Sequence, residues 1–487
     1  MQVSHAAALV CLAVSSNFVQ AQSLDGQIKN VTSRLSPTIV IKGEPIKYRT
    51  LTESMIKYKV PGVSVAVIHD GKLAWAQGYG VKAANNKEPV TSTTLFQAAS
   101  ISKPVTATAM LKLVEQGVFA LDAPINTYLK SWQLPENEFT KTEAVTLRRL
   151  VTHSAGLNVH GFPGYAQGVA IPTVPQILNG EKPANTEAVR VVMMPGSKWQ
   201  YSGGGTTIMQ LAMTDTTGLA FPDLMQRYVL GPVGMKNSAY EQPLSKAKQK
   251  LAAAGHDENG KVIAGSWHHY PELAAAGLWT TPTDLAKWAI EIAESRAGKS
   301  NKVLSPEMTN QMLTKQIGTS GLGPMLEGEG EAFAFEHGGS NEGYRCFIIY
   351  FPALRRGAVV MTNGENGSAI NRELLTAIAR EYQWPAFKVR EVEPLPLNTN
   401  LLDQLLGEYP LPPKSPSDTP PSIFIRNENG KLMIDIAAFF PKTEIVLLAN
   451  DELLVPENGF QLKLLKDADG RISGLDFNGN KLVKKGK

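Results

Sequence analysis

The sequence predicts an α+β protein: a large body of helices and strands followed by a small all-β domain. In the body, a strand hairpin precedes several amphipathic helices and two further buried strands, an order typical of α+β folds. Beyond about residue 400 the pattern changes to short strands separated by turn residues. At 487 residues the chain is long enough for two such bodies.

The first elements of the body are a hairpin and a helix. Residues 62–76 contain two apolar runs around Asp70-Gly71, a dipeptide that favours tight turns between antiparallel strands. Residues 102–116 have apolar side chains at helical spacing with Pro104 in the opening turn, which predicts a helix. Ser100 would then lie at the N-terminus of this helix.

Later parts of the body give one loop, one helix and two strands. Residues 161–183 contain four Gly and four Pro without a sustained period, so we expect a long loop that forms a lid or a binding wall. Thr281 and Pro282 are start signals for a helix over residues 285–293. Residues 347–351 and 358–361 are apolar runs that predict buried strands.

The domain boundary is expected in the proline-spaced residues 389–399, which we interpret as a linker between a body at 22–388 and a C-terminal domain at 400–487. Short β-type runs between turn dipeptides predict that this second domain is all-β. The runs are residues 422–426, 432–436, 444–448, 460–465 and 472–477.

Composition excludes several functions. The 48 Lys and Arg and 44 Asp and Glu leave a net charge of +4 without a basic stripe, so we expect no nucleic-acid partner. The longest apolar run, residues 6–14, is far shorter than the about 20 residues of a spanning helix, so no integral membrane segment is expected. Residues 1–21 end in small residues and predict a signal peptide, hence a secreted or periplasmic protein.

A serine and a lysine at the start of the predicted helix form the first chemical motif. Positions i and i+3 of a helix share one face, so Lys103 is placed to activate Ser100 as a nucleophile. Ser54 with Lys57, and Ser245 with Lys248, have the same spacing. Ser100 differs because an apolar segment precedes it and two further motifs follow downstream.

The second and third motifs are Tyr201-Ser202-Gly203 and His337-Gly338-Gly339-Ser340. A tyrosine with a pKa near 10 acts as a base only if cations stabilise its phenolate. Two glycines before a strand leave a backbone edge open to a substrate. Either motif alone is only weak evidence for a catalytic site.

In this order, the three motifs resemble those of the serine β-lactamase and penicillin-binding-protein superfamily, in its class C β-lactamase-like and D-alanyl-D-alanine carboxypeptidase-like branch. Supporting stretches lie at residues 150–157, 275–285 and 341–344, and the resemblance extends over about 48–382. It implies a β-lactamase/transpeptidase-like fold, an antiparallel sheet flanked by helices plus an all-α subdomain. The C-terminal domain resembles the barrel-like lipocalin domain that follows many such hydrolases.

The resemblance also implies roles for individual residues. Ser100 is the expected nucleophile, Lys103 its proton-transfer partner and Tyr201 the proton relay to the leaving atom. The backbone amides of Ser100 and Ser340 would form the oxyanion hole. Ser340 belongs to the same substrate-binding strand as Gly338 and Gly339. Such a serine hydrolase works through an acyl-serine intermediate, with no metal or cofactor, on a small-molecule or peptide substrate: an ester, a D-amino-acid peptide or a β-lactam.

Two departures from the family pattern bear on the substrate. Gly203 stands where the family usually has Asn, and His337, counted among the catalytic residues, stands where β-lactamases usually have Lys. Both changes favour esters or peptides over β-lactams. A homologue that binds penicillin or peptide without turnover and a true class C-type β-lactamase remain alternatives.

Two other chemistries compete less well. Residues 153–156 approximate a nucleophile elbow around Ser154, but Thr152 replaces the first glycine and no helix pattern follows. Metal catalysis would need ligands on a shared face, and the adjacent His268 and His269 cannot share a helical face.

Overall fold

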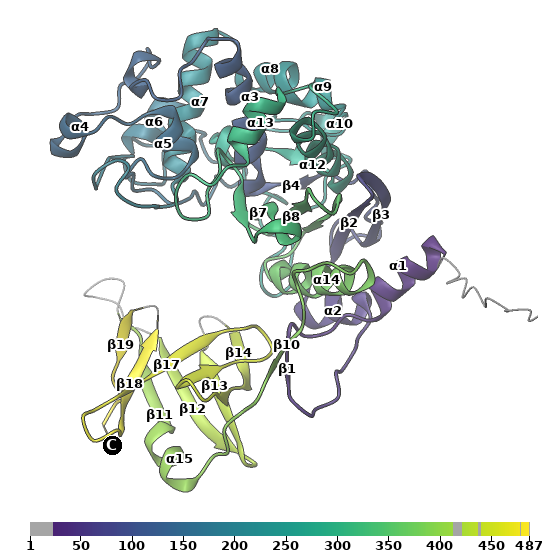
Figure 1. The fold of residues 1–487 in the computed structure, drawn as a ribbon, viewed down its shortest axis with the longest axis vertical. Coiled ribbons are helices and arrows are strands. Elements are labelled where there is room, and N and C mark those ends of the chain that lie inside the picture. The colour runs from purple at the N-terminus through teal and green to yellow at the C-terminus, as the bar shows by residue number, and fades with distance from the viewer. Residues whose placement is uncertain (1–22, 413–420, 437–439, 478, 487) are drawn as a thin grey trace, which may run out of the picture.

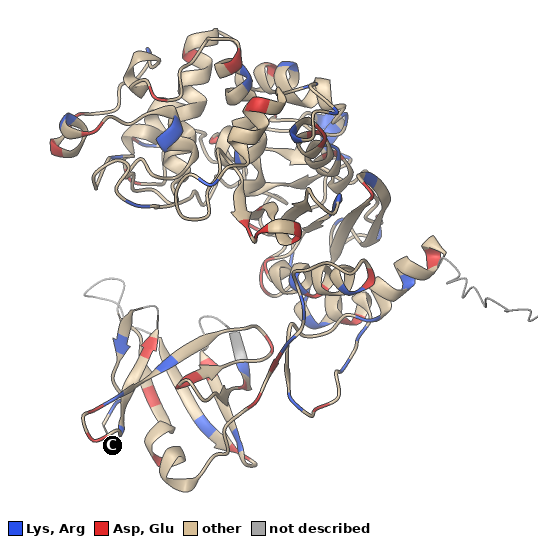
Figure 2. Cartoon of the chain, viewed as in Figure 1, with Lys and Arg blue, Asp and Glu red and all other residues tan. Residues whose placement is uncertain are grey.

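The computed structural model describes residues 23–412, 421–436, 440–477 and 479–486 (Figure 1). The expected signal peptide, residues 1–21, lies outside the described residues. Within the described residues, no helix has both the length and the apolar character needed to cross a bilayer. Acidic and basic residues are interspersed over both parts of the molecule, in keeping with the small net charge (Figure 2).

An antiparallel sheet and helices form the larger part of the molecule, as the sequence predicts. Among the described residues, six strands pair antiparallel in the order β3-β2-β9-β8-β7-β6. The expected hairpin is β2 and β3, with a turn at Asp70-Gly71 in which both residues have positive φ. The strand bounds are β2 (Gly62–His69), β3 (Lys72–Gly80), β6 (Met325–Glu327), β7 (Ala334–Asn341), β8 (Tyr344–Phe351) and β9 (Arg356–Thr362).

Helices cover both faces of this sheet. Val63, Val65 and Val67 of β2 pack toward α1, α2 and α14, whereas Ala66 and Ile68 belong to the core on the opposite face, against α12. Because both faces are covered, the strand is apolar at almost every position. The helix bounds are α1 (Leu24–Ser33), α2 (Leu51–Tyr58), α12 (Pro282–Arg296) and α14 (Gly367–Glu381).

An all-helical part adjoins the sheet, and together they form the expected β-lactamase/transpeptidase-like arrangement. Its elements α4 to α7 lie at the end of the molecule farthest from the C-terminal domain (Figure 1). The helix predicted at 102–116 is α3; β4, which pairs with β5 from much later in the chain, lies shortly before it in sequence. The bounds are β4 (Phe96–Gln97), η1 (Ala99–Ile101), α3 (Ser102–Glu115), η2 (Ile125–Thr127), α4 (Glu138–Thr142), α5 (Leu147–Val151), α6 (Val174–Asn179), α7 (Gly203–Thr217), α8 (Phe221–Met225), η3 (Gln226–Leu230), α9 (Gly231–Val233), α10 (Lys246–Gln249), α11 (Leu273–Ala276), β5 (Trp279–Thr280), α13 (Pro306–Met312) and η4 (Gly330–Ala332).

The C-terminal part is rich in strands, but its expected barrel-like form is wrong. Among the described residues, its strands pair as two antiparallel sheets, β11-β12-β13-β14 and β15-β16-β17-β18-β19. The chain passes from one sheet to the other at Ile445, between β14 and β15, so the two sheets share one hydrophobic core without closing. The bounds are α15 (Thr399–Leu405), β11 (Gly407–Pro410), β12 (Ser422–Glu428), β13 (Lys431–Ile436), β14 (Phe440–Glu444), β15 (Val446–Leu447), β16 (Glu452–Leu454), β17 (Gln461–Lys466), β18 (Ile472–Phe477) and β19 (Asn480–Leu482).

The segment expected as a linker contains a short strand. Within residues 389–399, β10 (Arg390–Val392) pairs in parallel with β1 (Ile39–Ile41) near the N-terminus. Ile39 and Val392 then pack with three buried side chains of the C-terminal domain, and Lys57 of α2 forms an ion pair with Glu457. The three side chains are Val446, Leu448 and Leu454. The two parts are therefore joined by packing as well as by the chain.

This arrangement predicts where the chain can be shortened. A chain of residues 23–398 keeps β10 and is expected to unfold in one cooperative thermal transition, at a lower midpoint than the full chain. Exposing Ile39 and Val392 costs about 1.5–3 kcal/mol for each side chain. A matched chain of residues 23–388, which lacks β10, should have a still lower midpoint because β1 loses its partner. Equal midpoints for the two shortened chains would show that the β1–β10 pair contributes nothing.

Candidate active site

Ser100 lies on a strained turn between β4 and α3. The backbone N–H of Ala98 donates to the carbonyl of Leu278 at 2.8 Å, which fixes the end of β4. Ala99 has a φ of 50°, a left-handed conformation that costs a non-glycine residue about 1–2 kcal/mol. The turn η1 follows, and it places Ser100 at the start of α3. A strained residue directly before a partly exposed serine is a common feature of functional sites.

The other serine of the motif holds this turn in place. Ser102 is fully buried; its hydroxyl donates to the carbonyl of Ala99 at 2.6 Å and accepts from the N–H of Leu278 at 3.1 Å. The hydroxyl of Tyr240 donates to the Ser102 carbonyl at 2.9 Å. Ser102 therefore has a structural role, and these three bonds offset the strain at Ala99.

Lys103 is buried next to Ser100. Its Nζ lies 3.0 Å from Ser100 Oγ and 2.9 Å from the carbonyl oxygen of Ala275, and only 5% of the residue is exposed. The same nitrogen lies 5.0 Å from the centroid of the Tyr201 ring. No carboxylate of the described residues forms an ion pair with Lys103. The lysine thus connects the serine of the first motif to the tyrosine of the second.

Tyr201 is positioned by the helix that follows it and by two histidines. Ser202 caps α7, since its hydroxyl accepts from the N–H of Gly205 at 3.1 Å. The N–H of Ser202 donates to Nδ1 of His153 at 3.2 Å, and the His153 ring lies 4.2 Å from the Tyr201 ring. The His160 ring is 4.8 Å from the Tyr201 ring. Tyr201 is therefore packed against two imidazoles as well as lying close to Lys103.

These histidines are missed as site residues by the sequence analysis. His153 does fall in one of the stretches that support the family resemblance, but nothing local to it indicates contact with Tyr201. His160 lies at the edge of the loop expected to form a wall, and it carries no motif of its own. Only the packing of the α5 region and this loop against the start of α7 brings them to the site.

All three histidines of the site favour the neutral form. Burial, followed by the charge of Lys103, holds the pKa of His153 well below its usual value of 6.5. The same two causes lower the pKa of His160 and bring the pKa of His337 to about 4. Neutral His153 is also required by its bond to Ser202, because Nδ1 accepts a hydrogen there. Lys103 is thus surrounded by uncharged aromatic groups.

The third motif forms an open strand edge beside Ser100. On its outer side, β7 pairs with β6 only as far as Glu336, so residues 337–341 have no strand neighbour there among the described residues. Asn341 and Tyr344 close a two-residue hairpin to β8. Such closing residues exchange hydrogen bonds, so the backbone groups of Ser340, one position earlier, point toward the open edge. The amide of Ser340 is therefore free to face a substrate.

Glycine at position 339 lets this edge approach the nucleophile. A Cβ there would lie 2.3 Å from the carbonyl oxygen of Ala98, so only glycine allows β7 to pass this closely over the turn before Ser100. Next to it, Nδ1 of His337 lies 2.6 Å from the carbonyl oxygen of Gly338 and donates to it. Nε2 of His337 is buried and has no partner among the described residues.

A cavity of about 870 Å³ brings the three motifs together. Part of the loop expected as a wall, residues 161–162, does line it. A side chain at Gly203 would meet the Phe162 ring at 3.0 Å, so this loop occupies the space where the family usually has Asn. The predicted site residues that line the cavity are Ser100, Lys103, Tyr201, His337, Gly338, Gly339 and Ser340.

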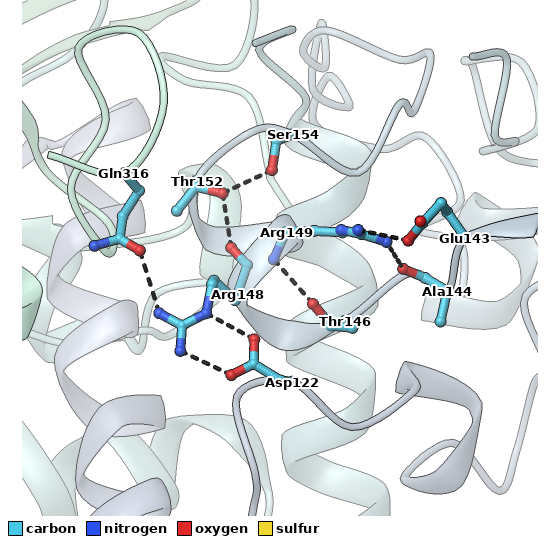
Figure 3. Close-up of polar contacts among 9 residues, drawn as sticks. All are labelled: Asp122, Glu143, Ala144, Thr146, Arg148, Arg149, Thr152, Ser154 and Gln316. Carbon is cyan, nitrogen blue, oxygen red and sulfur yellow. Dashed lines mark hydrogen bonds and ion pairs between the residues drawn. The ribbon is translucent and has the colours of Figure 1, made fainter. Parts of the chain in front are cut away.

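Ser154, the competing nucleophile, has the hydroxyl of Thr152 as its side-chain partner among the described residues (Figure 3). Its hydroxyl lies 2.9 Å from the hydroxyl of Thr152, which in turn donates to the carbonyl of Arg148 at 2.8 Å. Ser154 is buried and does not line the cavity, and the adjacent His153 uses Nδ1 for Ser202. The geometry therefore does not support a nucleophile elbow. In the described part of the chain, no three His, Cys, Asp or Glu side chains are grouped as a metal site requires.

Comparison with known proteins identifies the family. The family model described as Beta-lactamase matches residues 48–383, well over half of the chain. The chain belongs to the beta-lactamase family.

Individual members of the beta-lactamase family are distant from this chain. Protein flp of Staphylococcus aureus is 23% identical over 63% of this chain and 60% of its own length. The beta-lactamase of Pseudomonas fluorescens is 24% identical over 64% of this chain and 91% of that protein. Unguisins hydrolase ungD of Aspergillus violaceofuscus is 24% identical over 65% of this chain and 60% of its own length. The chain therefore spans less than two thirds of two of these relatives.

Solved structures show the same fold beyond the family match. The octameric penicillin-binding protein homologue from Pyrococcus abyssi has a TM-score of 0.60 and 22% identity, covering 89% of this chain and 98% of that one. SurE has a TM-score of 0.57 and 19% identity, covering 89% and 97%. The expected β-lactamase/transpeptidase-like fold is confirmed.

The lowered pKa of His337 predicts a specific pH dependence of stability. An unfolded histidine titrates near 6.5 and the folded one near 4, so the unfolded chain binds more protons between these values. The stabilisation from neutral His337 is complete above pH 6.5 and is lost as pH falls toward 4. Thermal midpoints measured across this range should fall less steeply in His337→Asn than in the wild type. Equal slopes in His337→Asn and the wild type would contradict the prediction.

Proposed function

We propose that the protein is a serine hydrolase in which acyl groups pass through Ser100. The observation that carries this is the 3.0 Å distance between Lys103 Nζ and Ser100 Oγ, inside a cavity that the open edge of β7 also lines. Membership of the beta-lactamase family supports the same chemistry. We also propose export to the periplasm or medium, on the basis of residues 1–21.

In the first half of the reaction, Lys103 as free base takes the proton of the Ser100 hydroxyl while Oγ attacks the substrate carbonyl carbon. The resulting oxyanion accepts hydrogen bonds from the backbone N–H groups of Ser100 and Ser340. One such donor is typically worth about 2.7–4 kcal/mol in the transition state. The bond to the leaving group then breaks, and Tyr201 transfers a proton from Lys103 to the departing oxygen or nitrogen. Water then takes the place of the leaving group: it loses a proton through Tyr201 to Lys103 as it attacks the acyl carbon. The bond from this carbon to Ser100 Oγ breaks as Lys103 returns a proton to Oγ, and the acid is released.

The charge distribution of the site favours esters over penicillins. Neutral His337 offers no cation to a substrate carboxylate at the place where β-lactamases usually have Lys. Gly203 offers no side-chain amide to the substrate, unlike the Asn usual in the family. Once Lys103 has taken the serine proton, its ammonium, 5.0 Å from the Tyr201 ring centroid, is the cation that would stabilise a Tyr201 phenolate. A simple carboxylic ester needs neither anchor and has a good leaving group. We therefore propose esters as the primary substrate class.

A D-amino-acid peptide is the second candidate substrate, and Arg372 favours it. This exposed residue of α14 lines the cavity and forms no ion pair among the described residues, whereas Arg345, the other arginine of the cavity, is paired with Glu365. A guanidinium at the rim is suited to a peptide C-terminal carboxylate. The solved structures similar in fold include SurE with D-Leu.

The test compares kcat/KM for a p-nitrophenyl ester, a D-alanyl peptide and a penicillin. We expect the wild type to prefer the ester to the penicillin. His337→Lys should shift the ratio toward the penicillin by about tenfold, because a charged hydrogen bond is worth roughly 1.5–3 kcal/mol. Arg372→Gln should lower kcat/KM for the peptide and leave that of the uncharged ester unchanged, and Ser100→Ala should abolish all three activities.

Several results would contradict this proposal. A wild type that prefers the penicillin, or a ratio unmoved by His337→Lys, would remove His337 as the determinant of substrate class. Intact-mass measurement separates the remaining alternative: a persistent penicillin adduct without turnover of any substrate would identify a binding homologue.

A further inference from the structure

The active-site cavity has a second end on the α14 side of β7, which Arg372 lines together with apolar side chains. From Ser100 it passes over the edge of β7 and reaches the face of β8 that α14 covers. Its lining there includes Phe347 of β8, Leu375 of α14 and Phe387. Gly338 lies opposite Phe347 in the β7–β8 register, and a Cβ at 338 would be 3.7 Å from the Phe347 ring. Because that distance is an ordinary van der Waals contact, β7 is not crowded at this position and does not block the route to Phe347.

A second hollow lies on the other side of Phe387. It has a volume of about 450 Å³ and is lined mainly by α14 and the segment after it, with apolar side chains such as Trp384 beside charged ones such as Arg380. Among the described residues, Phe387 is the single residue that lines both this hollow and the active-site cavity. Along α14, Leu375 faces the cavity while Ala379, one turn later, faces the second hollow. The Phe387 ring thus stands between the two spaces.

Two aromatic contacts and an unusual backbone conformation hold Phe387 in this position. Its ring packs edge-on against Phe347, with centroids 6.2 Å apart, and against Trp384 at 6.4 Å. Its φ is 55°, and Gln383 earlier in the same segment has a φ of 53°. Left-handed backbone is unfavourable for side chains of this size, so the surrounding packing must maintain it. No strand or helix of the described residues includes Phe387, so its side chain can be replaced by a smaller one without removing a sheet hydrogen bond.

We propose that Phe387 is a specificity-determining residue: it closes this second end of the cavity and sets the length of the apolar group that a substrate can extend from Ser100 across β7. The substrate class is then an ester or amide whose acyl part is a medium-length alkyl or aryl group. Phe387 makes no contact with the reacting atoms. This proposal rests on acyl transfer at Ser100, as argued above.

The test uses the full chain and alkyl fluorophosphonates of increasing chain length, which phosphonylate an activated serine with loss of fluoride. The rate of adduct formation is followed by intact mass. The wild type should react faster as the chain lengthens up to a limit, and more slowly beyond it. Phe387→Ala should move this limit to longer chains and raise the long-to-short rate ratio by at least about tenfold, equivalent to 1.4 kcal/mol. Phe387→Trp should move the limit to shorter chains.

A residue of the second hollow provides the matched control. Leu354 lines the second hollow but not the active-site cavity. Leu354→Ala should therefore leave the wild-type chain-length profile unchanged. It should alter the long-chain rates only when combined with Phe387→Ala. Phe387→Leu and Phe387→Trp keep the question answerable if the alanine variant does not fold.

The outcomes separate this proposal from the one on which it depends. If no short probe labels the wild type, acyl transfer at Ser100 is wrong. If short probes label the wild type and folded Phe387 variants equally, and the chain-length limit is the same in all of them, Phe387 is not the wall and this proposal is overturned.

Discussion

The site depends above all on one constraint, the immobilisation of the turn between β4 and α3. Ala99 is held in a left-handed conformation, which is unfavourable unless its neighbours fix it. The Ser102 hydroxyl bonds to both Ala99 and Leu278, and β7 lies so close to Ala98 that only glycine fits at 339. Ser100 and the edge of β7 are thereby held in a fixed relation. The large sheet provides the rigid support for that edge, which is why the helices on its two faces matter to the chemistry.

The electrostatics of the site follow from burial. Lys103 contacts a hydroxyl, a carbonyl and an aromatic ring, and the three imidazoles near it have lowered pKa values. Each neutral imidazole avoids a second buried positive charge beside the lysine, whose cost would be large in a medium of low polarity. The consequence is a site in which Lys103 can exchange a proton with Ser100 while the neighbouring imidazoles stay neutral and offer no charge to an anionic substrate.

Local signals explain how much of this could be predicted from sequence. Asp70-Gly71 and Pro104 mark the hairpin and the helix without reference to the rest of the chain, and the i, i+3 spacing already brings Lys103 to Ser100. The contacts of His153 and His160 with Tyr201 arise from segments distant in sequence, and neither residue has a local signal for them. The same holds for the pairing of β10 with β1 and for Phe387. In the C-terminal domain the strand runs were recognisable, but the change of sheet at Ile445 depends on tertiary packing, so the barrel-like expectation failed.

The most direct test of the account is to find which serine carries the reactive hydroxyl. The full chain is labelled with a small fluorophosphonate, digested, and the modified peptide is sequenced by mass spectrometry. The account predicts a single adduct on Ser100, formed at least about 100-fold more slowly in Lys103→Ala, since general-base assistance typically contributes 10²–10⁴-fold. An adduct on Ser154, or labelling of Ser100 at an unchanged rate in Lys103→Ala, would contradict it.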